Sequence, residues 1–324
     1  MRARQGNIRL TPEGEARASP VVIQGSVTKP LFKLVDYVII SFFDSIWMVY
    51  QQVTDSVTVA VNEYGSNLVC LELEDELIFV DAGLLTSYTA EFRKAMEAIT
   101  GKSASTLIMT HAHLDHLFGM GAFKDCNVIA AEASKSRFER FINLEYTEDV
   151  IRDRERVFPY FREAATQIEL RMPTTLVKDT LTVGDDEIFF KVEGGHSACS
   201  SSVHYKSGRV MAAGDLVQAE RYPYFGEPDT DLGRWIDALA TWEALDIIHV
   251  LPGHGPMVTR EYLGSVRTFI RDMLASVKQL KEQGVAVDDI IHHPDLPSGY
   301  WPHDAERKPA YDYSIRNLYQ HLQL

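Results

Sequence analysis

The sequence predicts an α+β fold in which two β-sheets pack face to face with helices on the outside. Groups of short β-rich segments occur in both halves of the chain, and helical segments follow each group. Hydrophobic residues make up 45% of the 324 positions, which is enough for a core of ordinary size. We therefore expect one compact domain with added segments.

Residues 1–44 are predicted to form an N-terminal extension. Residues 1–30 are polar, contain Gly and Pro, and show no hydrophobic period. No secretory signal is legible, so a cytoplasmic location is the default expectation. Three charged residues interrupt the apolar stretch Leu31–Tyr50, and such charges are costly inside a membrane. We expect this stretch to face the protein core and expect no membrane partner.

The main domain is predicted to span residues 45–258 and to begin with an antiparallel meander. Its short β-rich segments are separated by turn-like residues and are Ile46–Val53, Val57–Asn62, Asn67–Leu73 and Leu77–Val80. A helix over Ser87–Thr100 follows, because apolar side chains recur there at intervals of three and four. Thr106–Thr110 and residues 128–131 are predicted as strands. An αβ unit therefore follows the meander.

A helical insertion is predicted at about residues 134–172. This region is charged and aromatic, and Pro159 and Pro173 act as helix breaks. Its aromatic side chains either pack the insertion against a sheet or line a pocket. Packing is the preferred interpretation.

The second half of the chain again alternates strands with helices. Strands are predicted at Thr180–Val183, Glu187–Glu193, Ser201–Tyr205, Val210–Ala213 and Ile247–Leu251. Helices are predicted at about Thr230–Leu245, Thr259–Gln283 and Tyr311–Leu324. Residues 259–324 are thus expected to form a C-terminal helical segment packed on the same domain. Surface packing is its expected use, with a homodimer contact as the alternative.

Composition narrows the class of partner. The net charge of −14 repels a phosphate backbone, and no dense Lys/Arg run offsets it, so nucleic acid is a disfavoured partner. The three cysteines are an odd number and lie in apolar segments, which favours buried thiols over a disulfide framework. A small molecule is the expected substrate.

The segment Thr110–His116 carries the strongest chemical signal. Its pattern His-x-His-x-Asp-His follows an apolar strand and would arise by chance on the order of once in a thousand such chains. Alternate side chains of an extended backbone point the same way, so His111, His113 and Asp115 can converge on one side. His116 follows where the chain turns. Imidazole and carboxylate groups suit zinc, iron or manganese, whereas a structural role hardly explains three histidines beside an aspartate.

Four ligands cannot complete two metal sites, so further His or Asp residues are expected at later strand ends. His196, Asp215 and His254 meet this expectation. Each follows a β-rich segment and lies in a Gly-rich turn, where the backbone can bend tightly enough to aim a side chain. These three residues complete a candidate set of seven ligands.

The chain resembles the metallo-β-lactamase superfamily through five motifs in the family's order. They are Val80-Asp81-Ala82-Gly83, the His111–His116 segment, Gly195-His196, Gly214-Asp215 and Pro252-Gly253-His254-Gly255. The match covers about residues 45–260. The resemblance implies a four-layer αβ/βα sandwich of two mixed sheets with outer helices.

The resemblance also implies roles for the site residues. The ligands that it implies are His111, His113 and His196 for one metal and Asp115, His116 and His254 for the second, with Asp215 bridging both. Asp81 resembles the family's carboxylate that orients a ligand without touching metal.

Two divalent ions held in this way imply hydrolytic chemistry. Zinc is the expected metal, with iron or manganese as alternatives. The ions lower the pKa of a shared water towards neutrality and supply a metal-bridging hydroxide, while one of them polarises the substrate oxygen. Asp115 is also a candidate for proton transfer, in addition to its role as a ligand.

Asp215 argues against the true β-lactamase branches of the family, because those carry Cys or another residue at this position. The complete metal motif argues against flavodiiron proteins, and the acidic charge argues against nucleases. What remains resembles the glyoxalase II, lactonase and persulfide dioxygenase group. We expect hydrolysis of a small ester, lactone or thioester. The alternatives are a mononuclear iron persulfide dioxygenase and a metal-containing ligand-binding or regulatory protein with little turnover.

Candidate pocket residues lie shortly after Asp215. The lactonase-type tyrosine directly after the bridging aspartate is absent, since Leu216 stands there. Tyr222, Tyr224 and Phe225 follow a little later and are candidates for a pocket wall, with loop packing as an equal alternative.

Overall fold

The computed structural model describes residues 23–25, 37–41, 47–62, 65–301 and 307–323. The predictions made for residues 1–22 and for much of Leu31–Tyr50 therefore lie outside the described residues. Within the described part, none of the helices is both long and apolar enough to cross a membrane.

The first sheet has nine strands, which lie side by side in the order of the chain. They are β1 (Ile23–Gly25), β2 (Tyr37–Ser41), β3 (Trp47–Thr54), β4 (Val57–Ala60), β5 (Leu68–Glu72), β6 (Glu76–Val80), β7 (Ser103–Ile108), β8 (Asn127–Ala131) and β9 (Thr175–Val177). Neighbouring strands are antiparallel from β1 to β6 and parallel from β6 to β9. The direction changes because helix α1 (Thr86–Thr100) carries the chain back between β6 and β7.

The second sheet has six strands, also in chain order. They are β10 (Thr180–Val183), β11 (Ile188–Val192), β12 (Ser201–Tyr205), β13 (Val210–Gln218), β14 (His249–His254) and β15 (Val258–Thr259). Only β13 and β14 pair in parallel, because helix α6 (Leu232–Glu243) connects them. Both sheets are mixed and both carry helices, so the predicted fold class is confirmed.

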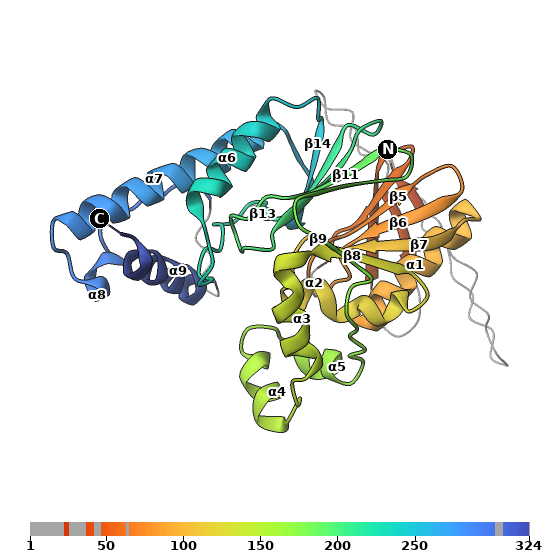
Figure 1. The fold of residues 1–324 in the computed structure, drawn as a ribbon, viewed down its shortest axis with the longest axis horizontal. Coiled ribbons are helices and arrows are strands. Elements are labelled where there is room, and N and C mark those ends of the chain that lie inside the picture. The colour runs from red at the N-terminus through yellow and green to blue at the C-terminus, as the bar shows by residue number, and fades with distance from the viewer. Residues whose placement is uncertain (1–22, 26–36, 42–46, 63–64, 302–306, 324) are drawn as a thin grey trace, which may run out of the picture.

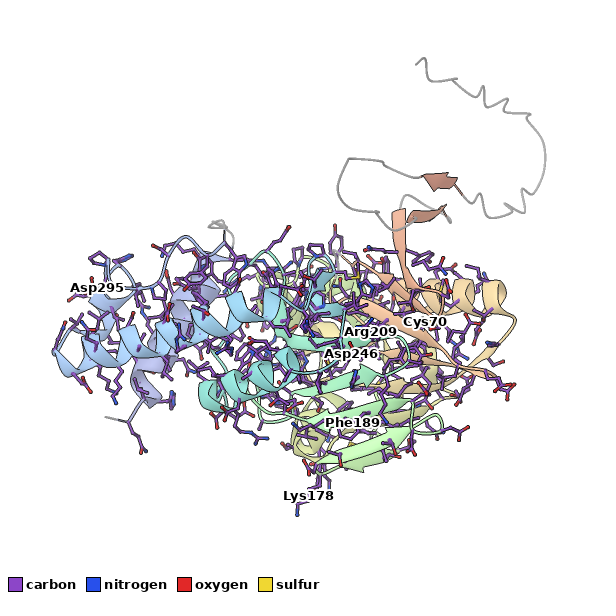
Figure 2. All side chains as sticks on the ribbon, turned by 90° about the horizontal axis from the view of Figure 1, so that it is seen from above. Cys70, Lys178, Phe189, Arg209, Asp246 and Asp295 are labelled. Atoms are coloured by element: carbon purple, nitrogen blue, oxygen red, sulfur yellow. The ribbon has the colours of Figure 1, made fainter. Side chains whose placement is uncertain are left out.

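Helices cover the sheets on their outer sides (Figure 1). Helix α1 lies along the first sheet, and α6 packs against both the second sheet and α7 (Tyr262–Glu282). Trp235 and Trp242 of α6 are fully buried in this second core. Helices α8 (Val287–Ile290) and α9 (Lys308–His321) complete it. Figure 2 shows Cys70 in the first sheet, Phe189 in the second sheet, and Asp295 in the C-terminal helical region.

The predicted helical insertion consists of three short helices that project from the first sheet (Figure 1). They are α3 (Lys135–Ile142), α4 (Glu148–Glu155) and α5 (Phe161–Ala165). Phe141 and Phe161 are buried, and their rings lie 6.1 and 5.6 Å from the ring of Phe118. Packing in the first hydrophobic core is therefore the observed use of Phe141 and Phe161, whereas Tyr160 is exposed.

Two strands run further than the sequence predicts, and one of them, β14, ends at His254 and not at Leu251. Strand β13 continues past Ala213 to Gln218, so Asp215 lies inside a strand and the expectation that it ends one was wrong. The register with β14 shifts on both sides of Gly214, whose φ is +51°. This irregularity lets the strand bend without ending, because glycine adopts positive φ without strain.

Candidate metal centre

Seven side chains from four segments meet: the segment after β7, the turn after β11, the irregular part of β13 and the end of β14. The first cluster consists of His111, His113, His196 and Asp215, and the second cluster consists of Asp115, His116 and His254. Within each cluster the candidate ligand atoms lie within 4.8 Å of one another. The structure thus brings together every residue that the sequence singles out as a candidate ligand.

The loop after β7 divides its side chains between the two clusters by changing conformation. His113 is extended, with φ −92° and ψ 155°, and immediately precedes helix α2 (Leu114–Leu117). Asp115 and His116 lie in α2, so their side chains leave the direction that the extended residues set. A strand-like half followed by a helical half therefore supplies ligands to both clusters.

Two glycines allow the close packing around the ligands. Gly195, next to His196, has φ +94°, and a Cβ atom there would lie 2.9 Å from a methyl carbon of Leu216. A Cβ atom on Gly253 would lie 2.1 Å from Oδ1 of Asp215. A larger residue at position 253 would have to displace the carboxylate of Asp215, and one at position 195 would have to displace Leu216 or Trp235.

Three imidazole nitrogens converge in the first cluster. His113 Nδ1 lies 3.0 Å from His111 Nε2 and 3.1 Å from His196 Nε2. His111 and His196 are fully buried or nearly so. His113 thus presents its Nδ1 atom to the cluster, whereas the other two present Nε2.

The outward nitrogens of two of these rings are held by hydrogen bonds. His196 Nδ1 donates to the backbone carbonyl of Tyr224 at 2.8 Å, and because a carbonyl only accepts, the proton lies on Nδ1. Thr110 donates its hydroxyl proton to Asp81, so its oxygen accepts from His111 Nδ1 at 3.1 Å. In both rings the Nε2 lone pair is therefore free to face the cluster.

Asp215 lies between the clusters. Its Oδ1 atom is 3.1 Å from His116 Nε2 and 3.4 Å from His254 Nε2, both in the second cluster. Its Oδ2 atom is 3.7 Å from His196 Nε2 in the first cluster. Asp115 Oδ2 lies 3.2 Å from the same His254 nitrogen. The two oxygens of Asp215 thus face different clusters.

Burial and neighbouring imidazoles keep two histidines of the first cluster unprotonated. Burial, and then the neighbouring His113, lowers the pKa of His196 to about 4. Burial and then His116 lower the pKa of His111 well below its ordinary value. Both rings are therefore neutral at neutral pH and offer lone pairs.

In the second cluster the pKa values of the histidines are raised instead of lowered. Burial is the largest single influence on His116 and His254 and lowers the pKa, but the neighbouring carboxylates, Asp215 first, together outweigh it and raise the pKa of both. Burial would raise the pKa of Asp115, but the hydrogen bond with His254 and the nearby imidazoles together outweigh it, and the pKa is about 2. Without a metal ion, protons thus balance the carboxylates of this cluster.

The two clusters fit divalent metal ions. His116 Nε2 and Asp215 Oδ1 are buried and have no hydrogen-bond partner among the described residues, a state that a bound cation would relieve. With Zn–N distances of about 2.0–2.1 Å in a tetrahedral site, two ligand nitrogens lie about 3.3 Å apart. The 3.0 and 3.1 Å separations in the first cluster need only a small expansion. The clusters are consistent with a dinuclear metal site.

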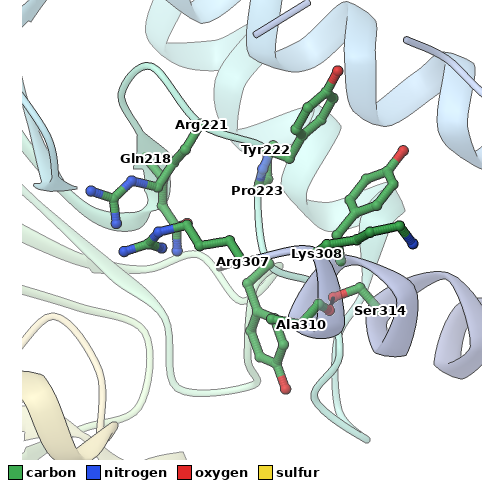
Figure 3. A pocket seen from close by; sticks show the side chains of 10 residues that line it. Gln218, Arg221, Tyr222, Pro223, Arg307, Lys308, Ala310 and Ser314 are labelled. Carbon is green, nitrogen blue, oxygen red and sulfur yellow. Dashed lines mark hydrogen bonds between the residues drawn. The ribbon is translucent and has the colours of Figure 1, made fainter. Parts of the chain in front are cut away.

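The predicted pocket residues separate in the structure. Tyr222 and Tyr224 line a cavity of about 50 Å³ together with Gln218, whereas Phe225 is buried and lines a second hollow between the 225–233 loop and α9. Figure 3 shows the side chains of Gln218, Arg221 and Arg307 on the same side of the first cavity, with Lys308 directed away from them.

Two contacts of the metal centre escaped the sequence analysis. Gln218 Nε2 donates to Asp215 Oδ2 at 2.8 Å. Glu227 Oε1 lies 3.2 Å from His113 Nε2, and its other oxygen accepts from Arg137. No local motif marks either residue, although both follow the Gly-Asp motif in the chain.

Comparisons with known proteins agree with this geometry. The sequence profile of the Metallo-beta-lactamase superfamily matches residues 61–254, a range that contains all seven side chains. The linear primary-alkylsulfatase of Pseudomonas sp. (strain ATCC 19151) is 23% identical over 295 residues, with 77% of this chain and 54% of that protein covered. The chain thus spans about half the length of this curated relative.

Solved structures show the same fold. A double mutant of the sec-alkyl sulfatase PisA1 superposes with a TM-score of 0.63 at 16% identity, covering 84% of this chain and 49% of that one. A metallo-beta-lactamase from Pontibacter korlensis gives 0.52 at 18% identity, covering 69% and 99%. The mono-zinc FIM-1 enzyme from Pseudomonas aeruginosa gives 0.52 at 18% identity, covering 69% and 95%.

Proposed function

Because this chain belongs to the metallo-beta-lactamase superfamily, we propose that it is a metallohydrolase that cleaves a small ester, lactone or thioester with two divalent metal ions. We propose zinc as the metal, with iron or manganese as alternatives. The proposed subgroup is the one that the sequence resembles, which includes glyoxalase II and lactonases.

The position of Asp215 carries this proposal. One of its oxygens faces the second cluster at 3.1 Å and the other faces the first cluster at 3.7 Å. A carboxylate placed in this way can neutralise two cations and hold them a few ångströms apart. A single structural metal site would need no such residue.

The ions, when bound, supply a hydroxide nucleophile at neutral pH and polarise the substrate oxygen. The residues of the chain fix the arrangement around them. Asp81 and Thr110 hold the outward nitrogens of His116 and His111. Asp115, with a pKa of about 2, is ionised but a weak base, so we assign it the ligand role first and proton acceptance second.

A sulfate ester is the second candidate substrate. Arg221 and Arg307 line the cavity beside Gln218, which bonds directly to Asp215 (Figure 3). Guanidinium groups bind sulfate and carboxylate oxygens through paired hydrogen bonds. Two of the relatives are named alkylsulfatases. An anionic group next to the scissile bond therefore suits this cavity.

The experiment is a turnover panel on the metal-loaded protein. Matched carboxyl esters, thioesters, lactones and alkyl sulfates are assayed with zinc, manganese or iron, and product release is measured with and without chelator. Metal-dependent turnover of one class supports the proposal. A protein that holds two ions per chain and turns over none of these classes contradicts it and supports a ligand-binding or regulatory role.

The persulfide dioxygenase alternative is tested separately. It requires one iron and molecular oxygen, so oxygen consumption with glutathione persulfide is the discriminating measurement. If the iron-loaded protein consumes oxygen and hydrolyses no ester, persulfide oxidation would replace the proposed function.

A further inference from the structure

We propose that Glu227, held by Arg137, is a positioning residue for the candidate metal ligand His113, and that it ties the helical insertion to the metal centre. The inference rests on the proposed metal site. It concerns the one ring of the first cluster whose outward nitrogen is held neither by the backbone nor by Thr110.

The orientation of the His113 ring is the first observation. Its Nδ1 atom lies 3.0 Å from His111 Nε2 and 3.1 Å from His196 Nε2, so Nδ1 is the atom offered to a metal. A ring that binds metal through Nδ1 carries its proton on Nε2. That atom lies 3.2 Å from Glu227 Oε1, an ion-pair distance without the alignment of a full hydrogen bond. Metal binding would place a proton between them.

The anchoring of Glu227 is the second observation. Its Oε2 atom accepts from Arg137 Nη2 at 2.8 Å, and both side chains are largely shielded from solvent, with 20% and 13% exposure. Asn317 of α9 donates to the backbone carbonyl of Glu227 at 3.1 Å. Arg137 thus fixes the carboxylate and Asn317 fixes the backbone of Glu227, and a residue that orients another needs such support.

Arg137 belongs to α3 of the insertion and not to the metal motif itself. The same Nη2 atom also contacts Asp229 Oδ1 at 2.8 Å. Among the contacts of the described residues, Asp229 has none with His113, and its side chain is more exposed, at 38%. The two acids therefore share one arginine, but only Glu227 reaches the metal centre.

Outer carboxylates of this kind fix the tautomer of a ligating histidine and increase its basicity, and their loss costs about 10–100-fold in metal affinity. Glu227→Ala should therefore weaken one of the two zinc-binding steps by about that factor. Glu227→Gln should recover part of the loss, because its amide oxygen still accepts a hydrogen bond. Asp229→Ala, the matched control on the same arginine, should leave both steps unchanged.

The experiment measures zinc affinity by competition with a chromophoric chelator, together with the visible spectrum of the cobalt-loaded protein. The cobalt spectrum reports ligand geometry and would not respond to a purely structural ion pair. A Glu227→Ala protein whose affinities and spectrum equal those of Asp229→Ala overturns the inference. If Glu227→Ala does not fold, Arg137→Gln tests the same link, and an unchanged cobalt spectrum there has the same meaning. A wild-type protein that binds none of zinc, manganese and iron would instead refute the proposed function.

Discussion

Asp81 Oδ2 lies 2.8 Å from His116 Nδ1, and both side chains are buried. The same carboxylate accepts hydrogen bonds from the backbone N–H and the hydroxyl of Thr110, at 2.8 and 2.7 Å. Asp81 directly follows β6 and has φ +60°. It therefore links the end of one strand to the metal motif after the next strand, and it directs the Nε2 lone pair of His116 inwards.

Replacing Asp81 should weaken metal binding more than it weakens folding. Asparagine tolerates positive φ, so Asp81→Asn keeps the backbone while removing the charge that orients His116. We expect a loss of about 10–100-fold in affinity for one metal ion. Asp55→Asn, on an exposed turn, is the control. Equal zinc affinity of both variants, measured by chelator competition, would refute the role given to Asp81.

Metal loading should depend on pH in one cluster only. His116 and His254 have raised pKa values, so an ion entering the second cluster must displace protons and binds more tightly as pH rises. His196, with a pKa of about 4, already offers its lone pair at neutral pH. Calorimetry in two buffers of different ionisation enthalpy counts the protons released in each step. Equal release in both steps would contradict this assignment.

The stability of the metal-free protein should fall as the solution becomes acidic. The pKa values of His111 and His196 lie below the ordinary value of 6.5, so between pH 6.5 and about 4 the unfolded chain takes up protons that the folded protein refuses. Each group lowers the free energy of unfolding by up to about 1.4 kcal/mol per pH unit. The raised pKa values of His116 and His254 act only above pH 6.5, where they add stability as the pH falls, so they do not offset this loss.

Urea unfolding with chelator at pH 7 and pH 5 measures this dependence. His196→Gln removes one of the two groups and should give a smaller change between the two pH values. A protein that is more stable at pH 5 than at pH 7 would show that the sign of the dependence is wrong.

Gly253 should tolerate no side chain. A Cβ atom there would lie 2.1 Å from Asp215 Oδ1 and 2.8 Å from the carbonyl carbon of Gly214. Gly253→Ala should cost about 1–3 kcal/mol of stability and displace the bridging carboxylate, with loss of one metal ion.

Gly264→Ala in α7 is the matched control for this substitution. Its Cβ atom meets only Glu243 Oε1, at 3.8 Å, so it should stabilise the helix by about 1 kcal/mol. Thermal unfolding and metal content distinguish the two variants. Full metal content in Gly253→Ala would show that Asp215 does not need this close approach.

The fold was predictable where hydrophobic periods are long and regular. Helix α1 and strand β12 lie where the side-chain pattern places them. Strand β13 was predicted too short, because Gly214-Asp215 has the composition of a turn and only pairing with β14 shows that the strand continues through a bulge. The two-residue strand β15 is too short to have a period.

The candidate ligands were predictable because each lies next to a glycine or within one dense motif. Glu227 and Gln218 were not, because nothing in the neighbouring sequence distinguishes them from other polar residues. Only the tertiary fold brings them next to their partners, His113 and Asp215. The glutamate is also fixed by Arg137, 90 positions away in the sequence. Such contacts arise only when the insertion packs beside the metal centre.

The location of bound metal tests the central claim most directly. Crystals of the zinc-loaded protein, measured at the zinc absorption edge, give the anomalous peaks of each ion. The account predicts two peaks per chain, one among His111, His113 and His196 and one among Asp115, His116 and His254, with an oxygen of Asp215 next to each. A single peak, or peaks elsewhere with Asp215 contacting none, would contradict it.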